Sequence, residues 1–278
     1  MITCYLSGGL GNQLFQIWFV LSLSITYSVP CYFIKSETLG KRHTYWDTLL
    51  LKKITPLLRD THLQNLILVN ESCFKEITFT PEYFTNKNYI FTYYFQDYRY
   101  TLYSFERIFL MLDIVNTKIT VMNNHSNYNY TKSTSIHFRF GDYKQLQEHY
   151  SLLTFDYYCN ALRHVLENEP PINITEEILI FYEEADREDV APIVEKLMEE
   201  PIFRNLNFKY IDISIPDWEQ MIMMSCCKNN IIANSTFSWW GAYLNITPKR
   251  QICYPKKWYS ENNPIDCSGL KIPFWVEI

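Results

Sequence analysis

The chain has 278 residues, a length that usually divides into about two domains and supplies enough side chains for a sizeable core. Apolar residues make up 47% of the sequence and charged residues 20%, a balance that excludes a disordered tail and a coiled coil. The 25 Lys and Arg against 30 Asp and Glu leave a net charge of -5, so we expect no nucleic-acid partner.

The cysteines and the apolar stretches indicate the cellular compartment. Eight cysteines are scattered without a C-x-x-C pair, which disfavours a zinc site and a dense disulfide framework and predicts mostly free, buried thiols. The apolar stretch 17–25 is much shorter than the roughly 20 residues of a membrane span, and no positively charged segment precedes it as in a signal peptide. We therefore expect a cytoplasmic protein with no membrane span.

The first part of the chain is predicted to begin as a strand, a glycine-rich turn and a helix. Residues 2–6 have the pattern of a short buried strand, and the apolar periodicity of residues 14–25 suits a buried helix. A second strand is expected at 31–34. The region 44–120 is aromatic-rich, and within it the run 89–103 is compatible with either strands or a packed loop.

A polar segment at 123–134 is the best candidate for a linker, because it has no aliphatic residues and is rich in turn formers. It predicts an N-terminal domain at 1–130 and a C-terminal domain at 131–278. In the second domain we expect strands at 135–138, 178–182, 208–213, 230–233 and 251–254, and helices at 155–166, 189–198, 217–226 and 235–245. This alternation predicts parallel sheets in an α/β fold.

Five of only seven glycines fall in three short segments, of which the first is GGLGNQ with Gly8, Gly9 and Gly11. It follows a strand and opens a helix, where backbone N–H groups can face an anion. Neither the G-x-G-x-x-G spacing nor the Gly-Lys-Ser/Thr of a P-loop is present, so a nicotinamide site is not expected. A tight strand-to-helix turn without a ligand is the alternative.

The second segment, around Gly141, places His137, Arg139 and Asp142 where an apolar strand ends, the edge at which open α/β sheets bind ligands. Strand alternation puts His137 and Arg139 on one face. An arginine there can grip a phosphate through two nitrogens, with Asp142 holding its guanidinium. The alternative is a structural Arg–Asp pair beside a core histidine.

The third segment, around Gly241, places Asn234, Ser235 and Thr236 between a strand and an aromatic helix. Ser235 suits the N-cap, and the N–H groups of the first turn with the Thr236 hydroxyl suit an anion. An ordinary capped core helix is the alternative.

Together, the second and third segments predict a diphosphate site formed by an arginine and a helix N-terminus at one sheet edge. A sugar-nucleotide transferase needs such a site to stabilise its departing nucleoside diphosphate. The sequence has no Asp-x-Asp motif and its six histidines are dispersed, so we expect transfer without a metal ion and without a bound cofactor.

The three segments resemble the signatures of glycosyltransferase family 11, the inverting α-1,2-fucosyltransferases. GGLGNQLFQ, the His-x-Arg-x-Gly-Asp-Tyr segment at 137–143 and IIANSTFSWWGAYLN at 231–245 occur in the order of that family. The resemblance implies a glycosyltransferase-B fold with two Rossmann-like domains facing a cleft. It also implies inverting transfer of L-fucose from GDP-fucose to a glycan acceptor, with the 2-hydroxyl of a terminal galactose as the expected site.

The resemblance also assigns roles to individual residues. Arg139 is expected to contact the diphosphate, His137 to lie by the nucleotide, and Asp142 to support the loop. Asn12, with Gly9 and Gly11, is expected to face the donor from the first domain. The remaining residues expected at the donor are Asn234, Ser235, Thr236, Phe237 and Gln220.

Two positions depart from the family pattern and leave the donor open. Phe140 stands where the family usually has a second arginine, and Gln220 stands where an acidic residue usually reads guanine. An amide has one accepting oxygen where a carboxylate has two. Another deoxy-sugar nucleotide is therefore an alternative donor, and a non-catalytic glycan-binding module is an alternative function. For the general base, Glu148 and His149 are candidates just beyond the second segment.

Overall fold

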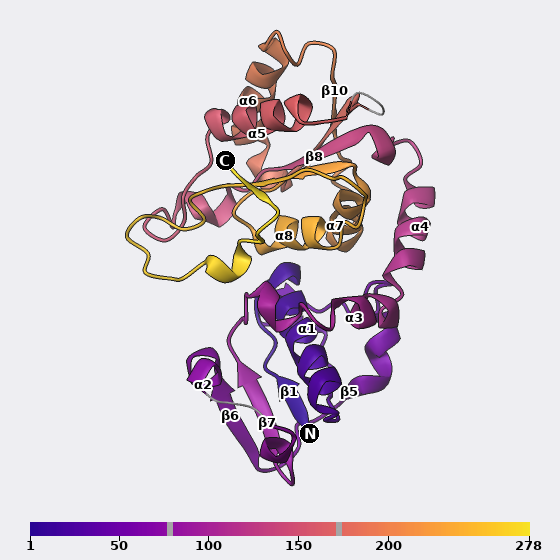
Figure 1. The fold of residues 1–278 in the computed structure, drawn as a ribbon, viewed down its shortest axis with the longest axis vertical. Coiled ribbons are helices and arrows are strands. Elements are labelled where there is room, and N and C mark those ends of the chain that lie inside the picture. The colour runs from indigo at the N-terminus through magenta and orange to yellow at the C-terminus, as the bar shows by residue number, and fades with distance from the viewer. Residues whose placement is uncertain (77–79, 171–173) are drawn as a thin grey trace. The chain divides into compact units, whose positions relative to one another are not determined.

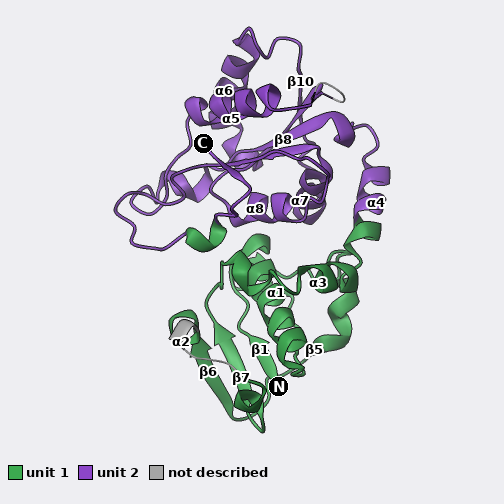
Figure 2. Ribbon diagram, in the orientation of Figure 1, with its two compact units in different colours: residues 1–117, 268–270 green, residues 118–267, 271–278 purple. Residues whose placement is uncertain are grey.

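The computed structural model describes residues 1–76, 80–170 and 174–278, and the chain forms two compact units (Figure 1). Figure 2 shows the first unit, residues 1–117 with 268–270, and the second unit, residues 118–267 with 271–278. Strands alternate with helices along both units, which confirms the α/β fold class predicted from the sequence.

The first unit is built on parallel strands around one buried helix. Strands β1, β7 and β6 pair in that order, β2 pairs with β5, and Ile2 bridges to Cys31, so the two groups of strands meet at β1. The strands are β1 (Ile2–Cys4), β2 (Phe33–Ile34), β3 (Thr38–Leu39), β4 (Arg42–His43), β5 (Leu58–Arg59), β6 (Leu66–Asn70) and β7 (Asn88–Thr92). The helices are α1 (Leu10–Tyr27), α2 (Glu71–Glu76) and α3 (Phe105–Met111). Most of α1 is buried, because it is apolar on nearly every side.

The second unit has a six-stranded parallel sheet in the order β10-β9-β8-β11-β12-β13. Numbered within the unit, this is the 3-2-1-4-5-6 order of a Rossmann fold. The strands are β8 (Ser133–His137), β9 (Glu177–Phe181), β10 (Asn207–Tyr210), β11 (Asn229–Ile231), β12 (Ile252–Tyr254) and β13 (Val276–Glu277). The helices are α5 (Phe155–Glu167), α6 (Arg187–Glu199), α7 (Asp217–Cys226) and α8 (Thr236–Tyr243). All the strands and helices expected in this region are present, and β13 is additional.

The units divide between Thr117 and Lys118, inside helix α4 (Ile114–Asn124), rather than at residues 130 and 131. The segment 123–134 packs into the second unit instead of forming a linker. Tyr130 is buried, and its carbonyl accepts a hydrogen bond from the Lys228 N–H at 3.0 Å. Backbone hydrogen bonds and a buried ring hold this segment in place of the aliphatic side chains that it lacks.

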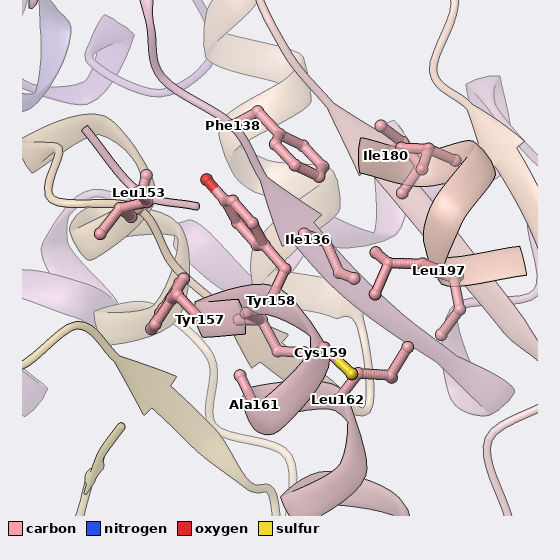
Figure 3. Close-up of a cluster of buried hydrophobic side chains, with 14 of the residues drawn as sticks. Ile136, Phe138, Leu153, Tyr157, Tyr158, Cys159, Ala161, Leu162, Ile180 and Leu197 are labelled. Carbon is pink, nitrogen blue, oxygen red and sulfur yellow. The ribbon is translucent and has the colours of Figure 1, made fainter. Parts of the chain in front are cut away.

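A hydrophobic cluster between β8 and helices α5 and α6 forms the core of the second unit (Figure 3). Ile136 and Phe138 of the β8 region pack with Tyr158 of α5 and Leu197 of α6. Because strand side chains alternate between faces, this packing fixes His137 on the opposite face of the sheet.

Two further findings concern the solvent environment of the chain. Within the described residues, no helix is both long enough and apolar enough to span a bilayer. The eight cysteines are free, and Cys4, Cys31, Cys159, Cys227 and Cys253 are buried.

Candidate functional site

The candidate site lies at the carboxyl ends of β8 and β11, the first and fourth strands of the second unit. In this strand order the connections leave these neighbouring strands toward opposite sides of the sheet, and the carboxyl edge between them is where open α/β sheets bind ligands. The second sequence segment follows β8 and the third follows β11. The fold therefore accounts for the meeting of two segments about 100 residues apart in the sequence.

Side-chain contacts join the two segments directly. The His137 and Phe237 rings have centroids 5.5 Å apart. The Tyr143 hydroxyl donates a hydrogen bond of 3.0 Å to the Asn234 carbonyl. The structure thus places a histidine, an arginine loop and the start of α8 in one cluster.

Arg139 is the cation of this cluster, and two carboxylates hold it. Its Nη2 atom lies 2.6 Å from Asp142 Oδ1, and its Nη1 atom contacts Glu183 Oε1. The guanidinium carbon lies 5.3 Å from the centroid of the Tyr143 ring. Burial opposes the charge of Arg139, but Glu183 and Asp142 hold the pKa of the guanidinium above its ordinary value. Two carboxylates around one guanidinium leave a local charge of about -1, so an anionic ligand must displace at least one of them.

The loop that carries Arg139 is fixed by the buried carboxylate of Asp186. Its two oxygens accept hydrogen bonds from the backbone N–H groups of Phe140 at 2.9 Å and Gly141 at 2.6 Å. Gly141 has a φ of +30°, a conformation that L side chains rarely adopt. Asp186 and the glycine together determine where the arginine leaves the strand.

His137 is buried and neutral. Burial, and then the nearby charge of Arg139, lower the pKa of its imidazole to about 3. Its Nδ1 atom is buried without a hydrogen-bond partner among the described residues. At neutral pH the ring therefore carries one N–H and one accepting nitrogen beside the arginine.

The start of α8 is a capped helix terminus, as the sequence predicts. The Ser235 hydroxyl accepts a hydrogen bond of 3.3 Å from the Phe237 N–H, while Thr236 opens the helix. The Asn234 amide donates to the carbonyls of Ser151 at 2.8 Å and Trp258 at 2.9 Å. Asn234 thus holds two neighbouring loops against the turn.

The other candidates of the second unit lie apart from these contacts. The Gln220 amide donates to the Ile215 carbonyl at 2.8 Å, and the adjacent Glu219 is paired with His125 at 2.7 Å. Glu148 is exposed, and its carbonyl accepts a hydrogen bond from the Ser260 hydroxyl. No printed contact among the described residues joins Glu148 or Gln220 to Arg139, so their roles stay predictions.

In the first unit, the glycine-rich segment forms a tight entry to α1. Gly8 has a φ of +78°, and a Cβ there would lie 2.6 Å from the Asn12 amide nitrogen. Asn12 in turn accepts a hydrogen bond of 2.9 Å from the Gln96 amide. Gly9 is the N-cap of α1, and Gly11 is buried in its first turn. These contacts explain the glycine at position 8 sterically, while the expected donor contacts of Asn12, Gly9 and Gly11 stay predictions.

Three residues of the cluster were not assigned from the sequence. Glu183 and Asp186 were visible only as an acidic run after a strand, and Tyr143 only as part of a motif. The signal that distinguishes them is strand order, because β9 neighbours β8 and delivers both acids to the arginine loop. Among the described residues, no group of three or more His, Cys, Asp or Glu is placed to hold a metal ion.

Comparison with known proteins identifies the class. The model of glycosyl transferase family 11 matches residues 203–277. The O-antigen biosynthesis glycosyltransferase WbnK of Escherichia coli is 33% identical over 149 residues, which cover 52% of this chain and 44% of that protein. An alpha-1,2-colitosyltransferase of Escherichia coli is 26% identical over 306 aligned positions, covering 100% of this chain and 99% of that protein. Among solved structures, an Arabidopsis thaliana FUT1 mutant in complex with GDP matches with a TM-score of 0.46 and 11% identity, covering 90% of this chain and 69% of that one.

The chain is thus a glycosyltransferase by its sequence relatives. It belongs to glycosyltransferase family 11, in agreement with the resemblance seen in its motifs. The alignment with WbnK spans less than half of that relative, whereas the alignment with the colitosyltransferase spans nearly all of it.

Proposed function

We propose that this chain transfers L-fucose from GDP-fucose to a glycan hydroxyl with inversion and without a metal ion. The acceptor position we propose is the 2-hydroxyl of a terminal galactose. The observation that carries the proposal is the cluster of Arg139, His137 and the α8 N-terminus at the carboxyl edge of the second sheet.

The chemistry of such a transfer explains why these groups belong together. As the bond between sugar and phosphate loosens, positive charge develops on the sugar carbon and negative charge on the leaving diphosphate. The planar guanidinium of Arg139 matches two phosphate oxygens, and the N–H groups at the start of α8 add fixed donors. In this proposal the diphosphate replaces Glu183 on the guanidinium, while Asp142 keeps it oriented.

Recognition of the nucleotide is proposed to involve Gln220. Because its amide nitrogen is used by the Ile215 carbonyl, the side chain has its oxygen to offer to a ligand. That oxygen can accept from one N–H of a guanine, and Glu219 does not supply a second acceptor because it is paired with His125. Glu148 remains the proposed general base, since it is exposed in the loop after the arginine segment.

Colitose is a second candidate for the transferred sugar. The relative that aligns over the whole chain is named an alpha-1,2-colitosyltransferase, and Phe140 departs from the usual arginine of the family at the donor loop. Phe140 is 7% exposed and packs in the core cluster of the unit, so it supplies no cation. A non-catalytic glycan-binding module is less consistent, because Arg139 is present. We propose a cytoplasmic enzyme whose partners are a nucleotide-sugar donor and a glycan.

Transfer from GDP-fucose and from GDP-colitose to lactose, each with EDTA, tests the proposal. We expect product from GDP-fucose, and a rate that EDTA leaves unchanged within about 2-fold, because protein cations and N–H groups replace the metal. Product from GDP-colitose alone would move the assignment to the second candidate. Abolition of transfer by EDTA, with recovery on adding Mg²⁺ or Mn²⁺, would contradict the proposed chemistry.

A further inference from the structure

The first unit contains a cavity of about 380 Å³ that none of the roles above uses. Its volume is at the small end of the range of about 300 to 1,000 Å³ that ligand pockets have. The polar and aromatic lining residues that bear on its ligand are Tyr5, Ser7, Ser36, Thr38 and His62. The cavity lies entirely within the first unit.

Its position follows from the parallel strands of that unit. One wall is the segment directly after β1, and another follows β2, so the cavity lies at the carboxyl ends of two strands, the usual edge for ligands. The hairpin of β3 and β4 forms a third wall, and its turn contains Gly40 at a φ of +65°.

The GGLGNQ segment supports this third wall. The Gln13 amide donates to the carbonyl of His43 in the hairpin at 2.9 Å and to that of Gly8 at 3.0 Å. Gln13 is buried, so these two hydrogen bonds hold the hairpin against the glycine turn. The family motif therefore has a second consequence, which is the shape of this cavity.

The lining selects an uncharged, hydroxyl-rich ligand. The lining residues described for this unit include no Lys, Arg, Asp or Glu, so a phosphate or a carboxylate finds no charged partner. The Tyr5 side chain is 62% exposed and offers an aromatic face. The Gln16 amide donates to the Ser7 hydroxyl at 3.1 Å, which orients that hydroxyl to donate its own hydrogen. An aromatic face beside hydroxyls suits a neutral sugar ring, with its apolar C–H face and its polar edge.

We propose that this cavity binds one neutral sugar ring of the acceptor glycan, with Tyr5 against the ring and Thr38 hydrogen-bonded to a ring hydroxyl. The inference rests on the proposed function, because only a transferase gives the bound ring the role of an acceptor. It adds a location and a chemical class, and it excludes an acidic sugar at this position.

Saturation-transfer NMR on the full chain tests the inference, with methyl β-galactoside as the probe and galacturonic acid as its charged counterpart. Tyr5→Ala and Thr38→Val should each weaken galactoside binding about 5-fold, the effect of losing one stacking or hydrogen-bonding contact. Tyr103→Ala removes a tyrosine that is 95% exposed in the same unit and is the matched control. Galacturonic acid should bind more weakly than the galactoside, and GDP affinity should be the same in all variants.

The outcomes separate this inference from the proposed function. Equal galactoside affinity in Tyr5→Ala, Thr38→Val and the control would overturn the cavity assignment. Absence of saturation transfer from galactose, glucose and N-acetylglucosamine alike would also overturn it. In both cases retained GDP binding would leave the proposed function standing, whereas loss of GDP binding in the unmodified chain would count against the function itself.

Discussion

Arg139→Ala should lower kcat/KM for transfer from GDP-fucose by about 10²-fold or more, the effect of removing one preorganised donor from a developing charge. The arginine is 14% exposed and sits between Asp142 and Glu183. Its loss leaves both carboxylates facing the diphosphate without a cation, which adds repulsion to the lost attraction. Steady-state kinetics with varied donor concentration measures the effect.

Two variants control for charge and for folding. Arg139→Lys keeps the charge but loses the planar fork, so it should recover only part of the rate. Arg187→Ala removes an arginine that is 68% exposed in the same unit and pairs loosely with Glu184, and it should leave the rate unchanged. Activity of Arg139→Ala within about 3-fold of the unmodified chain would show that Arg139 does not stabilise the leaving group.

Glu183→Gln should act in the opposite direction to Arg139→Ala on nucleotide binding. The carboxylate occupies the guanidinium atom that the diphosphate is proposed to use, and neutralising it removes that competition and a repulsive charge. We expect GDP to bind several-fold more tightly, by calorimetric titration. Weaker binding would indicate that Glu183 positions the arginine instead of competing for it.

Asp186→Ala should destabilise the chain by about 2 to 4 kcal/mol, because it orphans the N–H groups of Phe140 and Gly141 at a buried position. Asp186 is fully buried. Asp186→Asn keeps one accepting oxygen and should lose about half as much. Urea unfolding followed by circular dichroism measures the free energies of unfolding.

Asp189→Ala is the matched control for this experiment. Its carboxylate pairs with Lys144 at 2.7 Å on the surface, so its removal should cost less than about 1 kcal/mol. If Asp186→Ala were no less stable than Asp189→Ala, the loop that carries Arg139 would have to be held by other contacts.

The second unit could be predicted well from the sequence because each of its elements has its own local pattern. The strand ending at His137 and the helices α5, α6 and α7 show clear apolar periods between turn signals, and all are present. The region 44–120 could not be parsed, because its strands are short and its aromatic residues pack through distant contacts. The stacking of Phe19 on Phe95, with centroids 3.9 Å apart, is one such contact. Local patterns do not encode pairs of this kind.

The site was partly predictable for the same reason. Arg139 and Ser235 were found because each lies in a segment with an unusual glycine beside a strand end. Glu183 and Asp186 were not assigned, because their meaning depends on β9 lying next to β8, which is a property of the sheet order. The domain boundary was placed at residue 130 because polarity resembles a linker, although Tyr130 is buried.

Calorimetric titration of the chain with GDP and with UDP, in EDTA and without acceptor, tests the central claim most directly. The account predicts micromolar binding of GDP and at least about 10-fold weaker binding of UDP, because Gln220 offers an acceptor to guanine and Arg139 holds the diphosphate. Preference for UDP, or no binding of either nucleotide, would contradict the assignment of the second unit as a GDP-sugar site.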